Sequence, residues 1–139
     1  MQIRIATEEE KQLAFALRFE VFVYEQNVPA EIEIDEEDDY ALHFIAEEDG
    51  IIVGCARLIL SETDAHIGRL AVKKIYRGKN VGSEICRFII EYCRNQGYTY
   101  IWLNGQLQAS EFYKKLGFKP EGEIFLDAGI EHTKMTMNI

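Results

Sequence analysis

Residues 77–83, Arg-Gly-Lys-Asn-Val-Gly-Ser, lead from a basic stretch into an amphipathic segment. Four of the chain's 15 basic residues fall within seven positions here, in a chain of net charge -9: Lys73, Lys74, Arg77 and Lys79. The first turn of a helix leaves backbone N–H groups unpaired and carries partial positive charge, and glycines let an oxyanion approach that backbone closely. This stretch is therefore a candidate phosphate-binding loop.

The loop differs from two well-known phosphate-binding motifs. Gly78 and Gly82 do not have the P-loop spacing, and no Gly-Lys-Ser/Thr follows them. The G-x-G-x-x-G pattern of dinucleotide-binding folds is absent as well. The residues alone leave two interpretations open, an anion site and an ordinary solvated turn before a helix.

Hydrophobic periodicity and turn residues predict the elements that must position this loop. Asp49-Gly50 is typical of a hairpin turn, and the apolar run 98–103 is typical of a buried parallel strand. Thr7 with Glu10 predicts a capping box, whereas Gly97 and Gly117 predict helix ends. We predict strands at 2–5, 42–46, 51–60, 65–72, 98–103, 118–124 and 133–139, and helices at 8–24, 79–95 and 107–116. This order indicates a mixed α/β sheet.

Composition limits the function further. The 139 residues are expected to form a single domain, residues 1–139, and 47% of them are hydrophobic. The negative net charge argues against nucleic acid and against anionic membrane surfaces as partners. No stretch resembles a membrane span or a signal peptide, so a cytoplasmic location is expected. Three cysteines without a CxxC pair suggest buried apolar side chains, with no disulfide and no metal site.

Three segments of the chain resemble the GNAT superfamily of N-acyltransferases. Residues 77–82 fit the Arg/Gln-x-x-Gly-x-Gly/Ala form of its phosphate loop, and residues 106–118 resemble its A-x-x-F-Y-x-K-x-G-F helix. The run at residues 18–29, followed by the acidic stretch, resembles the ElaA-like bacterial branch: Arg18-x-x-Val21-Phe22-Val23-x-Glu25-Gln26-x-Val28-Pro29.

The resemblance implies a GNAT fold of the α/β (α+β) class, a central mixed and twisted sheet of about six to seven strands flanked by three to four helices. It also implies acetyl-CoA as cosubstrate, with the preceding strand along the pantetheine arm. The implied cofactor-binding residues are Leu70, Ala71, Val72, Arg77, Gly78, Lys79, Asn80, Val81, Gly82, Ser83, Asn104 and Phe112. Asn104 precedes a glycine and is equally well explained as a turn residue.

Two catalytic roles follow from the resemblance. Tyr113 stands at the general-acid position, although its spacing from Ala109 and Leu116 also fits a core tyrosine. Glu25 is the preferred general base, because it matches the branch's run at the end of the first helix. Other candidate bases are Glu31, Glu33, His43 and His66, and a water chain is equally acceptable. His43 alternates with apolar neighbours and is expected to face solvent.

Asn80 replaces a glycine usual in the family, and asparagine is the non-glycine residue that best tolerates a left-handed backbone, so we predict that conformation for it.

The stretch from Glu31 to Asp39 has seven carboxylates in nine residues. It either attracts a cationic amine by its field or is a mobile, solvated charged loop.

The sequence thus predicts an acetyl-CoA-dependent N-acetyltransferase acting on a primary amine, on a small molecule or a peptide, by direct attack in a ternary complex. A homodimer is left open. Two alternatives remain: an acyl-CoA-binding sensor or scaffold that has the same fold without turnover, and a partner-binding domain without a cofactor.

Overall fold

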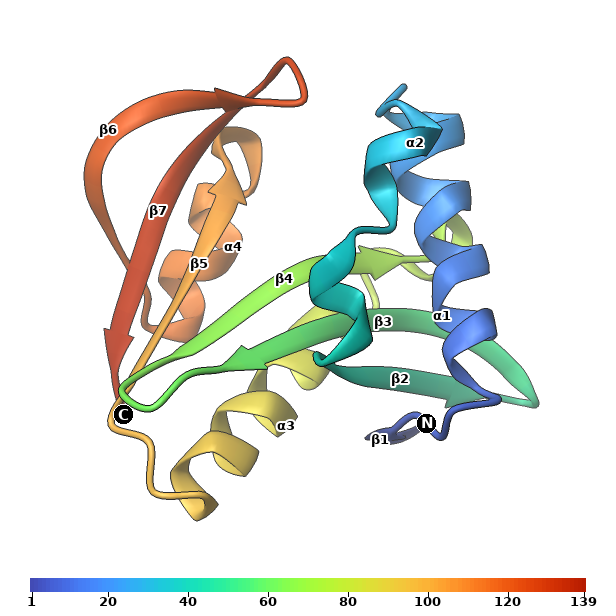
Figure 1. Cartoon of the computed structure of the whole chain (residues 1–139), viewed down its shortest axis with the longest axis horizontal. Coiled ribbons are helices and arrows are strands. Elements are labelled where there is room, and N and C mark those ends of the chain that lie inside the picture. Colours follow the sequence, from blue (N-terminus) through green and yellow to red (C-terminus); the bar gives the residue numbers. More distant parts are fainter.

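Seven strands form one mixed sheet in the order β1-β2-β3-β4-β5-β7-β6 in the computed structural model, which describes residues 1–139 (Figure 1). Their bounds are β1 Gln2–Ile5, β2 Leu42–Glu48, β3 Ile51–Leu60, β4 Ala65–Val72, β5 Tyr100–Gln106, β6 Lys119–Asp127 and β7 Ile130–Asn138. The predicted order of strands and helices is confirmed.

Only β4 and β5 run parallel to each other, as the crossover through a helix requires. Their pairing is short, since it ends after three residue pairs at Ile67↔Leu103. Beyond that point the two strands diverge and leave a V-shaped gap in the sheet (Figure 1). A gap in the middle of a sheet exposes backbone groups that have no strand partner, and such groups need other hydrogen-bonding partners.

The helical segments are α1 Lys11–Arg18, the π-helix η1 Phe19–Glu25, α2 Ala30–Glu33, the 3₁₀-helices η2 Glu36–Asp39, η3 Lys74–Tyr76 and η4 Leu107–Ala109, α3 Val81–Asn95 and α4 Ser110–Leu116. The predicted helix 8–24 is therefore α1 continued as a π-helix. Thr7 and Glu10 form the expected reciprocal capping bonds, 3.1 and 3.2 Å long.

The sheet has a separate core on each face. On one face, α3 packs against residues such as Phe44 and Val53 in a cluster of 16 buried residues. On the other face, α1 covers Ile45 and Cys55 in a cluster of eight. Because side chains alternate along a strand, neighbouring residues of β2 and β3 serve opposite cores. The two cores hold β4 in place just where the sheet opens.

Two sequence expectations are corrected by the fold. His43 is buried, not solvent-exposed, because its ring lies edge-on to Phe15 and its Nε2 lies 3.1 Å from the carbonyl oxygen of Asp38. The stretch 31–39 is not a mobile loop, because it contains α2 and η2 and buries two of its carboxylates. The three cysteines are buried, as expected.

Candidate active site

The gap between β4 and β5 opens into a cleft of about 880 Å³. Its walls come from β4, β5, the loop before α3, the helix α4, the end of η1 and the turn between β6 and β7. Of the predicted cofactor-binding residues, all but Lys79 line this cleft: 70–72, Arg77, Gly78, 80–83, Asn104 and Phe112. The fold thus brings together residues that lie more than thirty positions apart in the sequence.

The loop before α3 presents unpaired backbone donors to the cleft. None of the backbone hydrogen bonds outside the regular elements has its donor in residues 78–83, and no side chain caps the start of α3. Asn80 has φ +67°, which confirms the predicted left-handed conformation, and Gly78 has φ +77°. A row of unpaired N–H groups at the positive end of a 15-residue helix favours an anion.

Phe112 closes the other side of this loop. A Cβ placed on Gly82 would lie 3.2 Å from Cζ of Phe112. The absence of a side chain at residue 82 therefore allows α3 and α4 to approach each other at the mouth of the cleft. Lys79 instead lies with its ammonium group over the ring of Tyr76, 5.4 Å from the ring centre.

Tyr113 is positioned by packing. Its ring stands edge-on to Phe112 and Phe118, with ring centres 5.0 and 6.1 Å away. A Cβ on Gly105 would come within 2.9 Å of the ring, so that glycine provides the space for it. Burial raises the pKa of the Tyr113 hydroxyl above its usual range. The side chain lines the cleft as a protonated hydroxyl, which is the form a proton donor needs.

Glu25 lies outside the cleft in which a general base would act. Its carboxylate accepts two hydrogen bonds from Arg77, each 2.8 Å long, and it does not line the cleft. The hydrogen bond from Arg77 lowers the pKa of Glu25. Arg77 also donates from Nε to the carbonyl oxygen of Val72, 2.9 Å away. This placement argues against the base role and indicates that Glu25 ties η1 to the loop before α3.

Two of the other four candidate bases line the cleft. Glu31 and His43 do not. Glu33 does, but its Oε2 is bound by Arg18 at 2.9 Å and by Arg69 at 3.0 Å. Only the imidazole of His66 faces the cleft without a hydrogen-bonding partner in the protein.

The imidazole of His66 packs against an aromatic ring. It stacks on Trp102 with ring centres 3.7 Å apart, and Lys134 lies over the ring of Trp102 at 5.0 Å. Burial, followed by the charge of Arg57, lowers the pKa of His66 to about 4. The ring is therefore neutral at ordinary pH.

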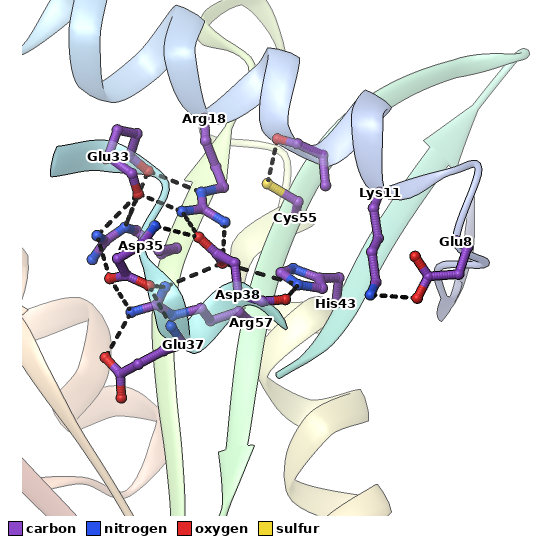
Figure 2. A network of polar contacts seen from close by, with 12 residues as sticks. Glu8, Lys11, Arg18, Glu33, Asp35, Glu37, Asp38, His43, Cys55 and Arg57 are labelled. Atoms are coloured by element: carbon purple, nitrogen blue, oxygen red, sulfur yellow. Dashed lines mark hydrogen bonds and ion pairs between the residues drawn. The ribbon is translucent and has the colours of Figure 1, made fainter. Parts of the chain in front are cut away.

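The acidic stretch forms an ordered network with arginines from three other elements (Figure 2). Arg18 of α1 binds Asp38 at 2.7 Å, and Arg57 of β3 binds both Asp38 at 3.1 Å and Asp35 at 2.7 Å. The side chains of Arg18 and Asp38 are almost fully buried. Because buried charges must be paired, the carboxylates of Glu33 and Asp38 are neutralised by arginines inside the protein, and only the exposed carboxylates of the stretch can contribute to a long-range field.

Sequence reasoning missed the arginines that border the cleft, Arg57 and Arg69. A signal existed for Arg57, since a single arginine within the apolar run Ile51–Leu60 must find carboxylate partners when that strand is buried. No such signal existed for the wall formed by the turn between β6 and β7 and by the strand ends beside it, which contribute Asp127 and His132. Strand pairing alone brings that turn to the cleft.

Comparison with known proteins agrees with this geometry. The acetyltransferase (GNAT) domain family matches residues 5–139 of the chain. A Bacillus subtilis (strain 168) protein described as the uncharacterized N-acetyltransferase YjcF is 40% identical over 92% of both chains. ElaA of Escherichia coli (strain K12) is 30% identical over 88% of this chain and 84% of its own. The chain belongs to the GNAT acetyltransferase family, and its relatives support the ElaA-like branch.

Solved structures share the fold. The crystal structure of Escherichia coli ElaA superposes with a TM-score of 0.88 at 26% identity, covering 98% of this chain and 99% of that one. A GNAT family acetyltransferase from Elizabethkingia anophelis, solved with acetyl-CoA bound, has a TM-score of 0.77 at 17% identity, covering 99% and 97% of the two chains. No helix of this chain has both the length and the apolar character that crossing a membrane requires.

Proposed function

We propose that the protein is an acetyl-CoA-dependent N-acetyltransferase that transfers an acetyl group to a primary amine by direct attack in a ternary complex. The observation that carries this proposal is the row of unpaired backbone N–H groups at residues 78–83, which opens onto the same cleft as Tyr113. The acetyl-CoA bound to the Elizabethkingia anophelis protein of the same fold supports it.

The residues present fit a thioester that carries phosphate groups. The N–H groups of residues 78–83 can donate to pyrophosphate oxygens, and the start of α3 adds positive charge there. Strand residues 70–72, which have no partner in β5, run from this loop toward the gap in the sheet and can border an extended pantetheine arm. A volume of about 880 Å³ is sufficient for a ligand of this size together with a small amine.

The chain's own groups supply two of the needs of the reaction. The bound thioester supplies an activated carbonyl group. A backbone N–H of β4 polarises that carbonyl, and Tyr113 Oη gives its proton to the sulfur as the C–S bond breaks and the C–N bond forms. The cysteines offer no covalent route, because burial raises the pKa of Cys86 to about 12 and leaves the thiols of Cys55 and Cys93 protonated as well.

The amine is best deprotonated in bulk solution, before it attacks as the neutral base. An alkylammonium group has a pKa of about 10, as in lysine, whereas His66 has a pKa of about 4. Transfer between them is uphill by about six units, or roughly 8 kcal/mol, so His66 is too weak a base for this task. The carboxylate of Glu33 is occupied by Arg18 and Arg69. The proposal therefore assigns no side chain as strong base and expects the rate to follow the neutral fraction of the amine.

A two-step experiment tests the proposal. Thermal unfolding is followed with and without acetyl-CoA, and the release of free thiol is then measured over a panel of polyamines, amino sugars, amino acids and peptides. We expect stabilisation by the cosubstrate and amine-dependent thiol release. Stabilisation with no release on any amine would favour a sensor or scaffold, and the absence of stabilisation would favour a partner-binding domain.

A further inference from the structure

Arg69 has an unusual backbone for a residue inside a strand. Its φ is +52°, in the left-handed region that costs L-residues roughly 1–2 kcal/mol. The other non-glycine residues with positive φ lie between elements: Asn27, Asp49, Asn80 and Ala128. Such a conformation persists only where its surroundings over-determine it, and it is found most often at functional sites.

The side chain of Arg69 is held by the acidic stretch. Its Nε donates to Oε2 of Glu33 at 3.0 Å and to the carbonyl oxygen of Glu33 at 3.2 Å. Its Nη2 donates to the same carbonyl at 3.1 Å and to Oδ2 of Asp35 at 3.3 Å. Glu33 is itself fixed by Arg18, and its side chain is only 2% exposed. We call these contacts of Arg69 with Glu33 and Asp35 the Arg69 clamp.

The left-handed residue creates a bulge in β4. Residues of β3 and β4 pair as Arg57↔Gly68 and then as Cys55↔Ala71, so Arg69 and Leu70 have no partner in β3. The pairing with β5 has already ended at Ile67, so the two residues have no partner there either. Arg69 and Leu70 both line the cleft. Neither residue therefore has a paired strand neighbour at the point where the sheet opens.

We propose that Arg69 is a positioning residue, whose clamp holds the bulge of β4 so that backbone N–H groups at Arg69 and Leu70 face the reacting carbonyl. This inference rests on the proposed acetyltransferase function and deepens it. The proposal also assigns a role to the acidic stretch. Glu33 and Asp35 act on the carbonyl from a distance, through Arg69.

The choice of substituent tests the proposal. Arg69→Ala and Arg69→Gly both remove the clamp, but only glycine adopts positive φ without strain. We expect Arg69→Ala to lower kcat by ~10²-fold, as removal of an oxyanion-hole donor does. Arg69→Gly should stay within about tenfold of the wild type, and the Kd for free CoA should change less than about threefold in both. Arg94→Ala, at an exposed site on α3, is the matched control.

A spectroscopic measurement separates positioning from a merely structural role. The ¹³C shift of the thioester carbonyl in bound [1-¹³C]acetyl-CoA should move downfield relative to free acetyl-CoA in the wild type. It should move less in Arg69→Ala than in Arg69→Gly. Asp35→Asn weakens the clamp from a partly exposed site, and an intermediate shift is expected there. This variant keeps the test decisive if Arg69→Ala does not fold.

Failure of the positioning role can be distinguished from failure of the proposed acetyltransferase function. A wild type that turns over amines, with equal kcat and equal carbonyl shifts in Arg69→Ala, Arg69→Gly and the wild type, would overturn the positioning role alone. An Arg69→Gly variant as impaired as Arg69→Ala would also overturn that role, because the backbone conformation would then not matter. A wild type that neither binds acetyl-CoA nor releases thiol would overturn the proposed function and this inference with it.

Discussion

At the scale of single residues, packing and chemistry can be separated most clearly at Tyr113. Its ring is fixed by Phe112, Phe118 and the space at Gly105, and its hydroxyl makes no hydrogen bond within the protein. Removing the oxygen should therefore leave the ring in place. The raised pKa of the hydroxyl means that it remains a proton donor throughout the range in which the enzyme can be assayed.

We expect Tyr113→Phe to lower turnover by ~10²–10⁴-fold, the usual contribution of a general acid. CoA affinity should change by less than about tenfold, or ~1.4 kcal/mol. The defect should shrink as pH rises, because a thiolate leaves unprotonated more readily there. The measurement is a pH–rate comparison on an amine found by the screen, with Tyr92→Phe on α3 as control. Equal rates for Tyr113→Phe and wild type would mean that Tyr113 is only a core residue and that water donates the proton.

Asn80 offers a test of backbone strain at the start of α3. Its left-handed backbone is tolerated by asparagine and free of strain for glycine. Asn80→Gly should be neutral or mildly stabilising, whereas Asn80→Val should cost on the order of 1 kcal/mol or more. Urea unfolding of the three proteins measures this. Indistinguishable midpoints would mean that the loop relaxes into another conformation.

At the scale of elements, periodicity predicted most of the sheet. The bounds of β3 and β4 agree with the sequence, and the Asp49-Gly50 turn has the expected positive φ at both residues. Regular apolar patterns specify such elements because side-chain period and burial are linked. The π-helix Phe19–Glu25 was not predicted, since a widened turn keeps the same apolar composition. The bulge at Arg69 leaves no periodic signal either.

The link between η1 and the loop before α3 can be tested through Glu25. Glu25→Gln removes a carboxylate that Arg77 already occupies, so kcat should stay within a few-fold of wild type. The loss of this partly exposed ion pair should cost about 0–1 kcal/mol of stability. Steady-state kinetics and urea unfolding provide both values. A fall in kcat of ~10²-fold or more, with normal folding, would restore Glu25 as the general base.

At the scale of the whole molecule, the charge pattern is understood only with the structure. Seven carboxylates in nine residues suggest a solvated or attracting surface when they are considered in sequence. Their partners Arg18, Arg57 and Arg69 come from α1, β3 and β4, and no local rule joins them. The motifs of residues 77–82 and 106–118 identified the cleft because they are local. The acid–base groups around it depend on long-range pairing, which sequence spacing does not reveal.

Removal of Arg18 should reveal how much the fold depends on this network. Arg18→Met keeps the length of the side chain but removes one of the two arginines that pair with each of the buried carboxylates, leaving Glu33 with Arg69 and Asp38 with Arg57. We expect a loss of about 3–5 kcal/mol in the free energy of unfolding. Arg94→Met removes an exposed pair with Glu91 and should cost no more than about 1 kcal/mol. Similar losses for the two variants would show that the network is dispensable.

Acid should destabilise the protein in two stages. His66 has a pKa of about 4 in the fold and about 6.5 when unfolded, so the unfolded chain takes up the proton first as pH falls. Stability should therefore decline between about pH 6.5 and 4, and buried His43, whose pKa is also lowered, acts in the same direction.

The second stage begins below about pH 4. Burial tends to raise the pKa of Asp38, but hydrogen bonds from Arg18, Arg57 and the backbone N–H of Asp35 outweigh it and hold the pKa well below its usual range. The stability that this pairing contributes is lost as the pH falls through that lowered pKa.

His66→Phe retains a ring to stack on Trp102 and removes one titration. Its unfolding free energy, measured in urea from about pH 7 to 4.5, should depend less steeply on pH than that of the wild type. Parallel curves would mean that His66 titrates alike in both states.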